Sequence, residues 1–252
     1  MAFLFSIFFW TFIALSSLAF MPIAFLIWAA TVLFDRRLVA LHAFTSYWAA
    51  LYTWLNPLWK VSVTGRERID RKEAYVMVSN HQSLVDILTL FRIFAHFKWV
   101  SKIENFYVPL IGWNMSLNRY IKLKRGSMRS NVQMLQDCED TLAQGSSVLI
   151  FPEGTRSGDG KVRTFKDGAF EVAQRARRPI LPIAVYGSSK ALPARGFTMR
   201  GNSDIRIHIL PPIPFEDFDG EESDELAERV RQIILTELQS MTGTSHAAPE
   251  ES

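Results

Sequence analysis

The chain has 252 residues, enough for one sizeable domain and an appended segment. Its single cysteine, Cys138, excludes an intramolecular disulfide, so nothing indicates an oxidising compartment. The net charge of +3 hides an uneven distribution, because residues 215–252 carry eleven acids against two bases and the remainder 26 bases against 14 acids. A basic body of this kind suits anionic lipid headgroups or phosphate-bearing substrates. We find no signature of a nucleic-acid-binding protein.

The first 34 residues contain no charged residue and no histidine. As a helix they would be ~51 Å long, against ~30 Å for the hydrocarbon core of a bilayer. Because Pro22 lies near enough to the middle to kink such a helix, a tilted span and a re-entrant hairpin both remain open. A cleaved signal peptide is disfavoured, since no basic residue precedes the apolar stretch. Arg36 and Arg37 follow directly and predict that the rest of the chain lies on the cytoplasmic face of the inner (cell) membrane.

Residues 38–59 are rich in aromatic side chains, among them Tyr47, Trp48, Tyr52 and Trp54. This density suits a helix in the headgroup region of a membrane. A helix buried against the following domain explains it equally well. We therefore expect residues 1–60 to form membrane-associating helices, a span or hairpin followed by an interfacial helix.

From residue 61 onwards, short apolar runs alternate with amphipathic stretches. This alternation predicts an α/β domain over residues 61–241, with a mostly parallel central sheet and helices on both faces. Residues 242–252 are expected to form a disordered tail. The expected strands are Ala74–Ser79, Lys98–Ser101, Tyr120–Leu123, Ser147–Phe151, Ile180–Tyr186 and Ile205–Leu210. The expected helices are Leu84–Phe94, Met128–Ala143, Ala169–Arg175 and Ser223–Met241.

The stretch from Asn80 to Asp86 lies between an expected strand and an expected helix. We expect His81 in the connecting loop and Asp86 in the first helical turn, where the helix dipole keeps the carboxylate ionised. The carboxylate could then hold one imidazole nitrogen and leave the other free to take a proton. A purely structural role is the alternative, because Ser83 followed by Asp86 also fits a helix N-cap with an acidic third position.

A second polar loop, Pro152–Ser157, follows the apolar strand that ends at Phe151. Gly154 allows close backbone approach, Thr155 offers a hydroxyl, and Arg156 carries a fork suited to phosphate. Because binding sites in parallel sheets gather at the carboxyl ends of strands, we expect this loop to share one sheet edge with His81.

Together these two stretches resemble the glycerolipid acyltransferases. Asn80–Asp86 has the His-x4-Asp form of that family, and Phe151–Ser157 resembles its second signature, Phe-Pro-Glu-Gly-Thr-Arg-Ser. The similarity is closest to the bacterial 1-acyl-sn-glycerol-3-phosphate acyltransferases and covers roughly residues 63–210. The apolar N-terminus is consistent with their membrane association.

Weaker blocks match the same family. Residues 180–185 resemble its last apolar block, and Arg125 matches the Arg of its Phe-Ile-x-Arg block. Lys102 stands where relatives often carry Lys. Two positions depart from the pattern: Lys122 replaces the aromatic residue, and Arg119 stands where the family usually has Gly.

The resemblance implies transfer of an acyl group from acyl-CoA or acyl-carrier protein to the sn-2 hydroxyl of 1-acyl-glycerol-3-phosphate, giving phosphatidic acid. His81 would act as general base and Asp86 would stabilise the imidazolium. Backbone N–H groups around Gly154 are candidates for the oxyanion hole. The residues expected to bind substrate are Lys102, Arg125, Glu153, Gly154, Thr155 and Arg156. Glu153 is expected to orient its loop or a substrate hydroxyl, and the arginines and Lys102 to grip the phosphate.

We expect no metal and no cofactor beyond the acyl-carrying co-substrate, since no cluster has metal-ligand spacing. A covalent acyl-enzyme is disfavoured, because Cys138 is remote in sequence from both motifs and no Gly-x-Ser-x-Gly elbow is present. The main alternative is an O-acyltransferase that acts on a lyso-ornithine lipid or another lysophospholipid. A lipid hydrolase and a catalytically silent membrane-binding protein are weaker alternatives.

Overall fold

The computed structural model describes residues 2–157, 161–194 and 196–243. Seven strands form one sheet in the order β1-β7-β6-β2-β5-β3-β4. Their bounds are β1 Trp59–Thr64, β2 Val76–Ser79, β3 Phe97–Lys102, β4 Ile121–Leu123, β5 Ser147–Ile150, β6 Ile180–Tyr186 and β7 Ser203–Ile209. The longer helices are α1 Ala2–Thr31, α2 Val39–Trp54, α3 Val85–Leu90, α4 Ile111–Leu117, α5 Met128–Ala143, α6 Gly168–Ala176 and α8 Ser223–Gly243, and α7 is the single turn Ser188–Ala191.

The sheet is mostly parallel, as the alternating pattern predicts. Strands β6, β2, β5, β3 and β4 run in one direction. Strand β7 is antiparallel to β6 and parallel to β1, so these two strands run the other way. The carboxyl ends of the five parallel strands therefore meet at one edge, which we call the carboxyl edge.

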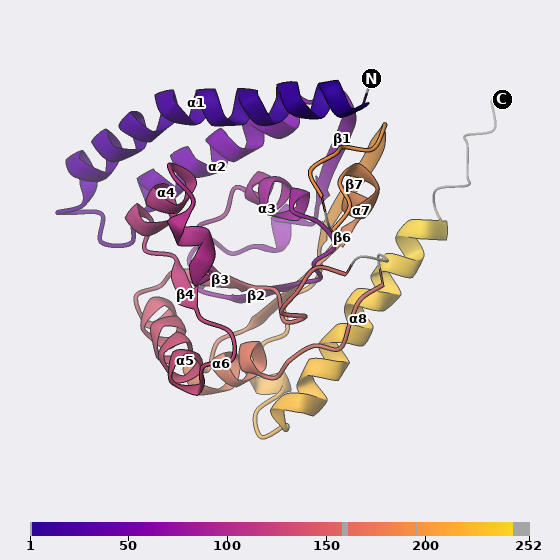
Figure 1. Cartoon of the computed structure of the whole chain (residues 1–252). Coiled ribbons are helices and arrows are strands. Elements are labelled where there is room, and N and C mark those ends of the chain that lie inside the picture. The colour runs from indigo at the N-terminus through magenta and orange to yellow at the C-terminus, as the bar shows by residue number, and fades with distance from the viewer. Residues whose placement is uncertain (1, 158–160, 195, 244–252) are drawn as a thin grey trace.

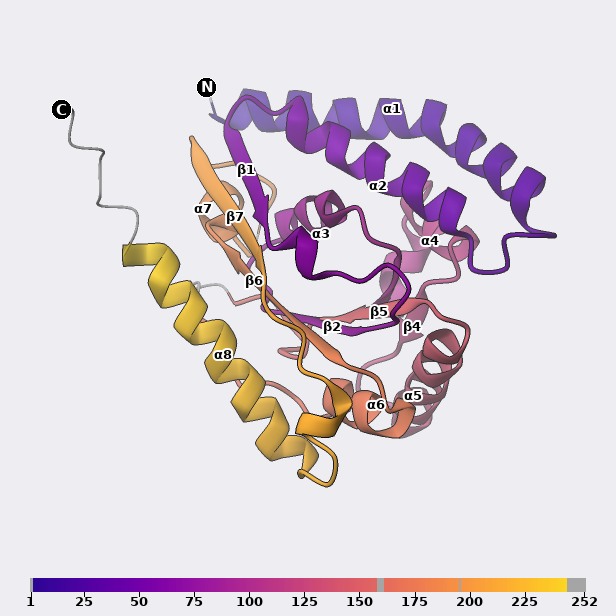
Figure 2. The same cartoon turned by 180° about the vertical axis from the view of Figure 1, so that it is seen from behind.

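Helices cover both faces of the sheet (Figures 1 and 2). Val76 and Val78 of β2 point to the face covered by α5, α6 and α8, whereas Met77 between them points to the face covered by α2 and α3. Because β2 and β5 are buried on both faces, their sequences are continuous apolar runs. The expected α/β architecture is confirmed.

The predicted elements agree closely with the structure in the middle of the chain. The helix expected over 128–143 has those bounds, and the strand over 180–186 does too. The helix expected over Leu84–Phe94 is instead α3 followed by a 3-10 turn at Phe91–Ile93. Residues beyond 243, which include most of the tail expected to be disordered, lie outside the described residues.

Among the described strands and α-helices, three were not predicted. Trp59, expected to end the aromatic helix, begins strand β1, where side chains alternate between buried and exposed. Helix α4 was missed because it is only 7 residues long and contains Gly112, a weak helix former. Helix α7 was missed because it is a single turn of 4 residues.

Helices α1 and α2 lie side by side and together cover one side of the domain (Figures 1 and 2). Pro22 lies within α1, which continues through it as a single helix, the one described helix long and apolar enough to cross a membrane. The ring of Phe20 packs against Trp48, and Ser16 hydrogen-bonds Tyr52. The aromatic side chains of α2 are thus partly buried beneath α1, while α1 exposes a long apolar face that includes Phe3, Leu4, Phe8, Leu15, Leu18, Phe25 and Leu26.

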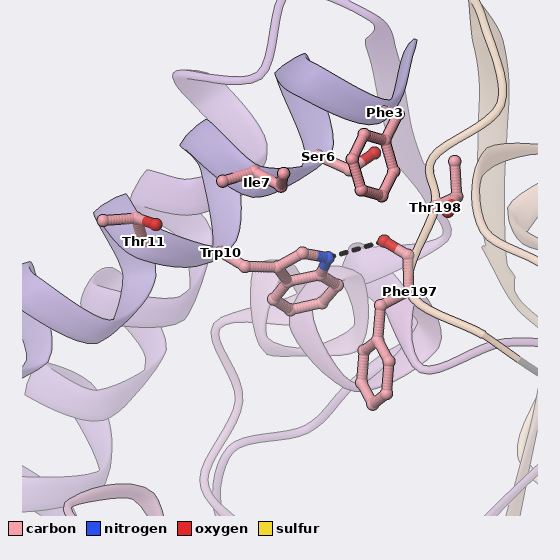
Figure 3. A pocket seen from close by; sticks show the side chains of 7 residues that line it. All are labelled: Phe3, Ser6, Ile7, Trp10, Thr11, Phe197 and Thr198. Atoms are coloured by element: carbon pink, nitrogen blue, oxygen red, sulfur yellow. Dashed lines mark hydrogen bonds between the residues drawn. The ribbon is translucent and has the colours of Figure 1, made fainter.

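The N-terminal turns of α1 are also fastened to the segment before β7. The indole N–H of Trp10 donates to the carbonyl of Phe197 at 2.7 Å, as Figure 3 shows. The hydroxyl of Ser6 accepts the N–H of Met199 at 2.8 Å. An apolar cavity of about 460 Å³ lies between α1 and this segment, and no titratable side chain lines it. Its lining residues are Phe3, Ser6, Ile7, Trp10, Thr11, Phe197 and Thr198.

Candidate active site

His81 and Asp86 form a hydrogen-bonded pair at the carboxyl edge. His81 lies in the loop after β2, and Asp86 lies in the first turn of α3. The imidazole Nδ1 is 2.9 Å from Asp86 Oδ2, and the carboxylate is fully buried while the His81 side chain is 13% exposed. Asp86 Oδ2 also accepts the backbone N–H groups of Gln82 and Ser83 at 2.6 and 2.8 Å. The carboxylate therefore holds both the ring and the loop that carries it.

Asn80 fixes the point at which this loop leaves the sheet. Its side-chain amide donates to the carbonyl of Val185 and accepts the N–H of the same residue, at 2.9 and 2.8 Å. The buried Asn80 side chain thus takes the place of a backbone partner and extends the hydrogen bonds between β2 and β6 beyond the last paired residue of β2. His81, the next residue, is consequently presented at the edge of the sheet.

The His81 ring stacks on Phe151 at the end of β5. The ring centroids are 3.9 Å apart and the planes are nearly parallel, at 9°. With Nδ1 bonded to Asp86 and one ring face covered, Nε2 makes no hydrogen bond within the described part of the chain. This nitrogen is therefore available to a proton from a bound substrate.

Glu153 joins the two signature loops. Its Oε1 accepts the backbone N–H of His81 at 2.7 Å, and its Oε2 accepts the N–H of Arg163 at 3.0 Å. Ser157, at the end of the second loop, adds a further hydrogen bond between the loops, because its N–H donates to the His81 carbonyl at 2.9 Å. Burial raises the pKa of Glu153, although both N–H donors act in the opposite direction. Glu153 thus orients backbone in the structure.

Between Glu153 and Ser157, the loop turns sharply. Gly154 has a φ of +67°, a left-handed conformation that glycine adopts freely, and the Lys166 side chain lies against the place of its missing Cβ. The Gly154 N–H donates to the Phe151 carbonyl at 3.1 Å and closes the turn. The N–H groups of Thr155 and Arg156 make no hydrogen bond with described residues, and neither does the Arg156 guanidinium.

The structure places Lys102 and Arg125 at the same sheet edge as the two loops. Lys102 ends β3 and pairs in register with Leu123, the last residue of β4, so Arg125 follows two residues beyond. The two departures from the family pattern do not enter this arrangement. Lys122 lies 5.1 Å above the ring of Phe106, a cation–π contact, and Arg119 precedes β4 at the opposite edge.

Two features of the site were not predicted from the sequence. The stacking of Phe151 on His81 depends on the adjacency of β2 and β5. The contact of Arg163 with Glu153 depends on the return of the chain after the second signature. Of these two features, only the role of Phe151 could have been suspected from the sequence, because it is an aromatic residue directly after a buried strand. No group of three or more His, Cys, Asp and Glu in the described residues could hold a metal ion.

Comparison with protein-family models gives a match to the model described as Acyltransferase. The match extends over residues 60–186, half of the chain, and includes both signature loops. The chain belongs to the acyltransferase family.

Within this family, the chain is similar to several 1-acyl-sn-glycerol-3-phosphate acyltransferases. It is 37% identical to one from Chlamydomonas reinhardtii over 225 residues, which cover 86% of this chain and 65% of that protein. It is 36% identical to a chloroplastic one from Brassica napus over 209 residues, 82% of this chain and 59% of that protein. The human alpha enzyme is 32% identical over 181 residues, 70% of this chain and 63% of that protein. The chain thus spans less than two thirds of the length of these relatives.

The acyltransferase fold is also that of a solved structure. The crystal structure of the 1-acyl-sn-glycerophosphate acyltransferase from Thermotoga maritima superposes with a TM-score of 0.77 and covers 100% of both chains. Since the identity is 21%, the similarity concerns the fold.

Proposed function

We propose that this protein transfers an acyl group from acyl-CoA or acyl-carrier protein to the sn-2 hydroxyl of 1-acyl-glycerol-3-phosphate and so produces phosphatidic acid. The observation that carries the proposal is the His81–Asp86 pair, buried on one side and braced by the Glu153 loop. The names of the relatives support the same reaction. No resident cofactor takes part in the proposed reaction.

In the proposed mechanism, His81 is the general base. Its Nε2 removes the proton of the acceptor hydroxyl as the oxygen attacks the thioester carbonyl, and Asp86 stabilises the imidazolium. Collapse of the tetrahedral intermediate breaks the carbon–sulfur bond, and the leaving thiolate takes the proton back from His81. A base of this kind contributes about 10²–10⁴-fold to the rate.

Stabilisation of the oxyanion is assigned to the loop after Glu153. The Gly154 N–H is used within the turn, so the N–H groups of Thr155 and Arg156 are the better donors. The role of Gly154 is then to permit the left-handed turn that presents them.

The phosphate of the acceptor is assigned to the cationic side chains at the carboxyl edge. Arg156 has a guanidinium with no partner among the described residues, and its planar fork suits a phosphate. Lys102 and Arg125 add two cations from neighbouring strands of the same edge. Glu153 does not repel the phosphate in this arrangement, because both of its oxygens are turned to backbone N–H groups.

We further propose that the protein works on the cytoplasmic face of the cell membrane, held there by α1. The outer face of α1 is apolar along its length, and its inner face is tied to α2. A helix fastened in this way is better suited to lie in the membrane surface than to cross it. Arg36 and Arg37, in the turn between α1 and α2, favour the cytoplasmic side.

The test is a panel of lyso-lipids offered to the purified protein with one labelled acyl donor, followed by identification of the products. We expect acylation of 1-acyl-glycerol-3-phosphate in preference to a lyso-ornithine lipid or lysophosphatidylcholine. Release of free fatty acid in place of an acylated lipid would identify a hydrolase. Parallel reactions with acyl-CoA and acyl-carrier protein determine the donor.

Two variants test the assigned roles in the same assay. His81→Ala should lose about 10²–10⁴-fold in kcat while lysophosphatidate still binds. His208→Gln is a matched control, because His208 lies on β7 and contacts Glu237 and Arg68. Arg156→Ala should mainly raise KM for the phosphorylated acceptor, with no such change for an acylglycerol that lacks the phosphate. Full activity of His81→Ala would refute the proposed mechanism.

A further inference from the structure

A second cationic site lies at the opposite end of the sheet from the candidate active site. Three arginines, Arg36, Arg37 and Arg119, line an open recess of about 570 Å³ together with Val32 and Gln144. No acidic side chain is among the residues that line it. We call this site the cationic recess.

The cationic recess is separate from the carboxyl edge. Arg119 precedes β4 and Gln144 precedes β5, whereas Glu153 follows the end of β5. At ~3.3 Å per residue, β5 alone places the two ends about 10 Å apart, and the flanking turns add to this separation. An anion in the recess would therefore not touch the His81 pair.

Two of the three guanidiniums make no contact with the described chain that would explain them, and the third makes a single hydrogen bond. Arg37 donates to the carbonyl of Gly145 at 2.7 Å, which caps the end of α5 and holds the side chain in place. Arg36 and Arg119 make no ion pair or hydrogen bond through their side chains with described residues, and both are exposed. Helix capping thus explains the position of Arg37 but not the presence of the other two.

Cationic groups outnumber the nearby Asp35 carboxylate around the recess. Lys98, buried behind it, donates to the carbonyls of Arg37 and Asn118 at 2.7 and 2.8 Å. Burial lowers the pKa of Lys98 to about 7, with Arg119 and Arg37 acting in the same direction against the Asp35 carboxylate. Like charges gathered in one place favour binding of an anion that compensates them.

Arg119 also occupies a backbone conformation that does not favour it. Its φ is +54°, in the left-handed region, where a residue other than glycine is uncommon. A residue other than glycine that is held in this strained conformation is a pattern found where the side chain has a use, which supports a binding role for Arg119.

The side chains next to the recess indicate what kind of molecule carries the anion. Leu33 and Phe34, in the turn between α1 and Arg36, are 89% and 76% exposed. They continue the exposed apolar face of α1 up to the edge of the recess. Large apolar side chains beside arginines are the combination found where a protein meets an anionic bilayer surface.

We propose that the cationic recess binds the phosphate group of an anionic membrane phospholipid and so anchors the C-terminal end of α1 to the bilayer. The proposal uses the membrane association proposed above but not the catalysis. Arg36 and Arg119 supply the free guanidiniums, and Arg37 lines the recess beside them. The lipid is recognised through its phosphate, while Leu33 and Phe34 contact its acyl region.

The test is flotation of the full chain with vesicles of phosphatidylcholine alone or mixed with phosphatidylglycerol. We expect the unmodified protein to prefer the mixed vesicles, and the double variant Arg36→Gln/Arg119→Gly to lose that preference by about tenfold or more, since each cation at a lipid surface contributes about 1 kcal/mol. Binding to phosphatidylcholine should be unchanged. Arg119→Gly relieves the strain of the left-handed backbone at this position, so the fold should be preserved. A thermal unfolding curve verifies this.

The double variant Arg71→Gln/Lys72→Gln is the charge-matched control, because both side chains are exposed in the turn before β2 and their replacement also removes two positive charges. An equal loss in this control would overturn the proposal in favour of diffuse electrostatics, as would an unchanged preference in Arg36→Gln/Arg119→Gly. If inorganic phosphate alone binds in an Arg119-dependent manner and vesicles show no preference, the recess serves free phosphate and the lipid proposal fails. Repeating flotation with His81→Ala separates this result from the proposed catalysis, since the preference should persist in that variant.

Discussion

The ring of His81 lies flat on the ring of Phe151, with the centroids 3.9 Å apart and the planes 9° apart. Asp86 holds one nitrogen of the same ring from the side. The imidazole is therefore fixed in both position and tilt before any substrate arrives, which removes an ordering step from the proposed reaction.

Phe151→Leu should weaken this fixation without removing the base. A stacked aromatic pair contributes about 0.5–1.5 kcal/mol beyond its buried area, so we expect kcat to fall about tenfold with little change in KM. Steady-state kinetics with 1-acyl-glycerol-3-phosphate measures this. Phe215→Leu, at an aromatic contact near α8, is the matched control and should keep its kcat.

Asp86→Asn should separate charge from shape. The asparagine oxygen can still accept the N–H groups of Gln82 and Ser83, but the negative charge opposite the imidazolium is lost. We expect kcat to fall about 10²–10⁴-fold while the unfolding midpoint drops only modestly. Asp86→Ala should lose a further 1–2 kcal/mol, roughly, because the loop N–H groups then have no acceptor. Near-normal turnover in Asp86→Asn would exclude a role for the charge.

Glu153 is expected to act on catalysis through backbone. Each of its oxygens accepts one N–H, from His81 and from Arg163. Glu153→Gln keeps one acceptor and loses the other, whereas Glu153→Ala loses both, so stability and kcat should fall in the order Glu, Gln, Ala. Each buried N–H left without a partner costs about 1–3 kcal/mol. Thermal unfolding and kcat measured on the same samples test this order; a change confined to KM would instead indicate direct substrate contact.

Two histidines predict sensitivity to acid: His42, which is buried within α2, and His96, which is partly buried next to it. Burial, with Lys98 and Arg37 acting in the same direction, lowers the pKa of His96 from 6.5 to about 3, against the opposing Asp35 carboxylate. Burial lowers the pKa of His42 as well. As the pH falls below 6.5, the unfolded chain gains protons that the folded chain does not, so stability should decrease toward pH 3.

Each such histidine contributes up to about 1.4 kcal/mol per pH unit within that window. His96→Gln should therefore flatten the fall in unfolding free energy with decreasing pH. Ser146→Ala, which removes the hydrogen-bond partner of His96 but no titrating group, serves as the control and should keep the slope. Equal slopes for the wild type and His96→Gln would contradict the assignment.

Cys138 should be dispensable for turnover. It lies on α5, is completely buried, and burial raises the pKa of its thiol. Cys138→Ala should keep kcat and lose about 1 kcal/mol of stability through the small cavity. A maleimide should leave the native protein active and label it only on unfolding. Inactivation of the native protein with modification at Cys138 would revive the acyl-enzyme alternative.

The features that depend on neighbouring residues could be predicted from the amino-acid sequence. Buried strands such as β2 and β5 are visible as continuous apolar runs, and α5 and α8 as amphipathic periodicities. The five-residue spacing of His81 and Asp86 already required one residue in a loop and the other in the first turn of a helix. Each of these follows from the local backbone geometry of strands and helices.

Which strands are neighbours could be learned from the three-dimensional fold alone. The adjacency of β2 and β5 brings Phe151 and Glu153 against His81, and no local pattern encodes it, because strand order arises from pairing across long crossovers. The same topology carries Arg119 to the edge opposite the candidate active site, where it meets Arg36 from the turn after α1. A departure from a family motif thus became part of a separate site, since residues close in sequence to a functional loop can lie at the far end of a strand.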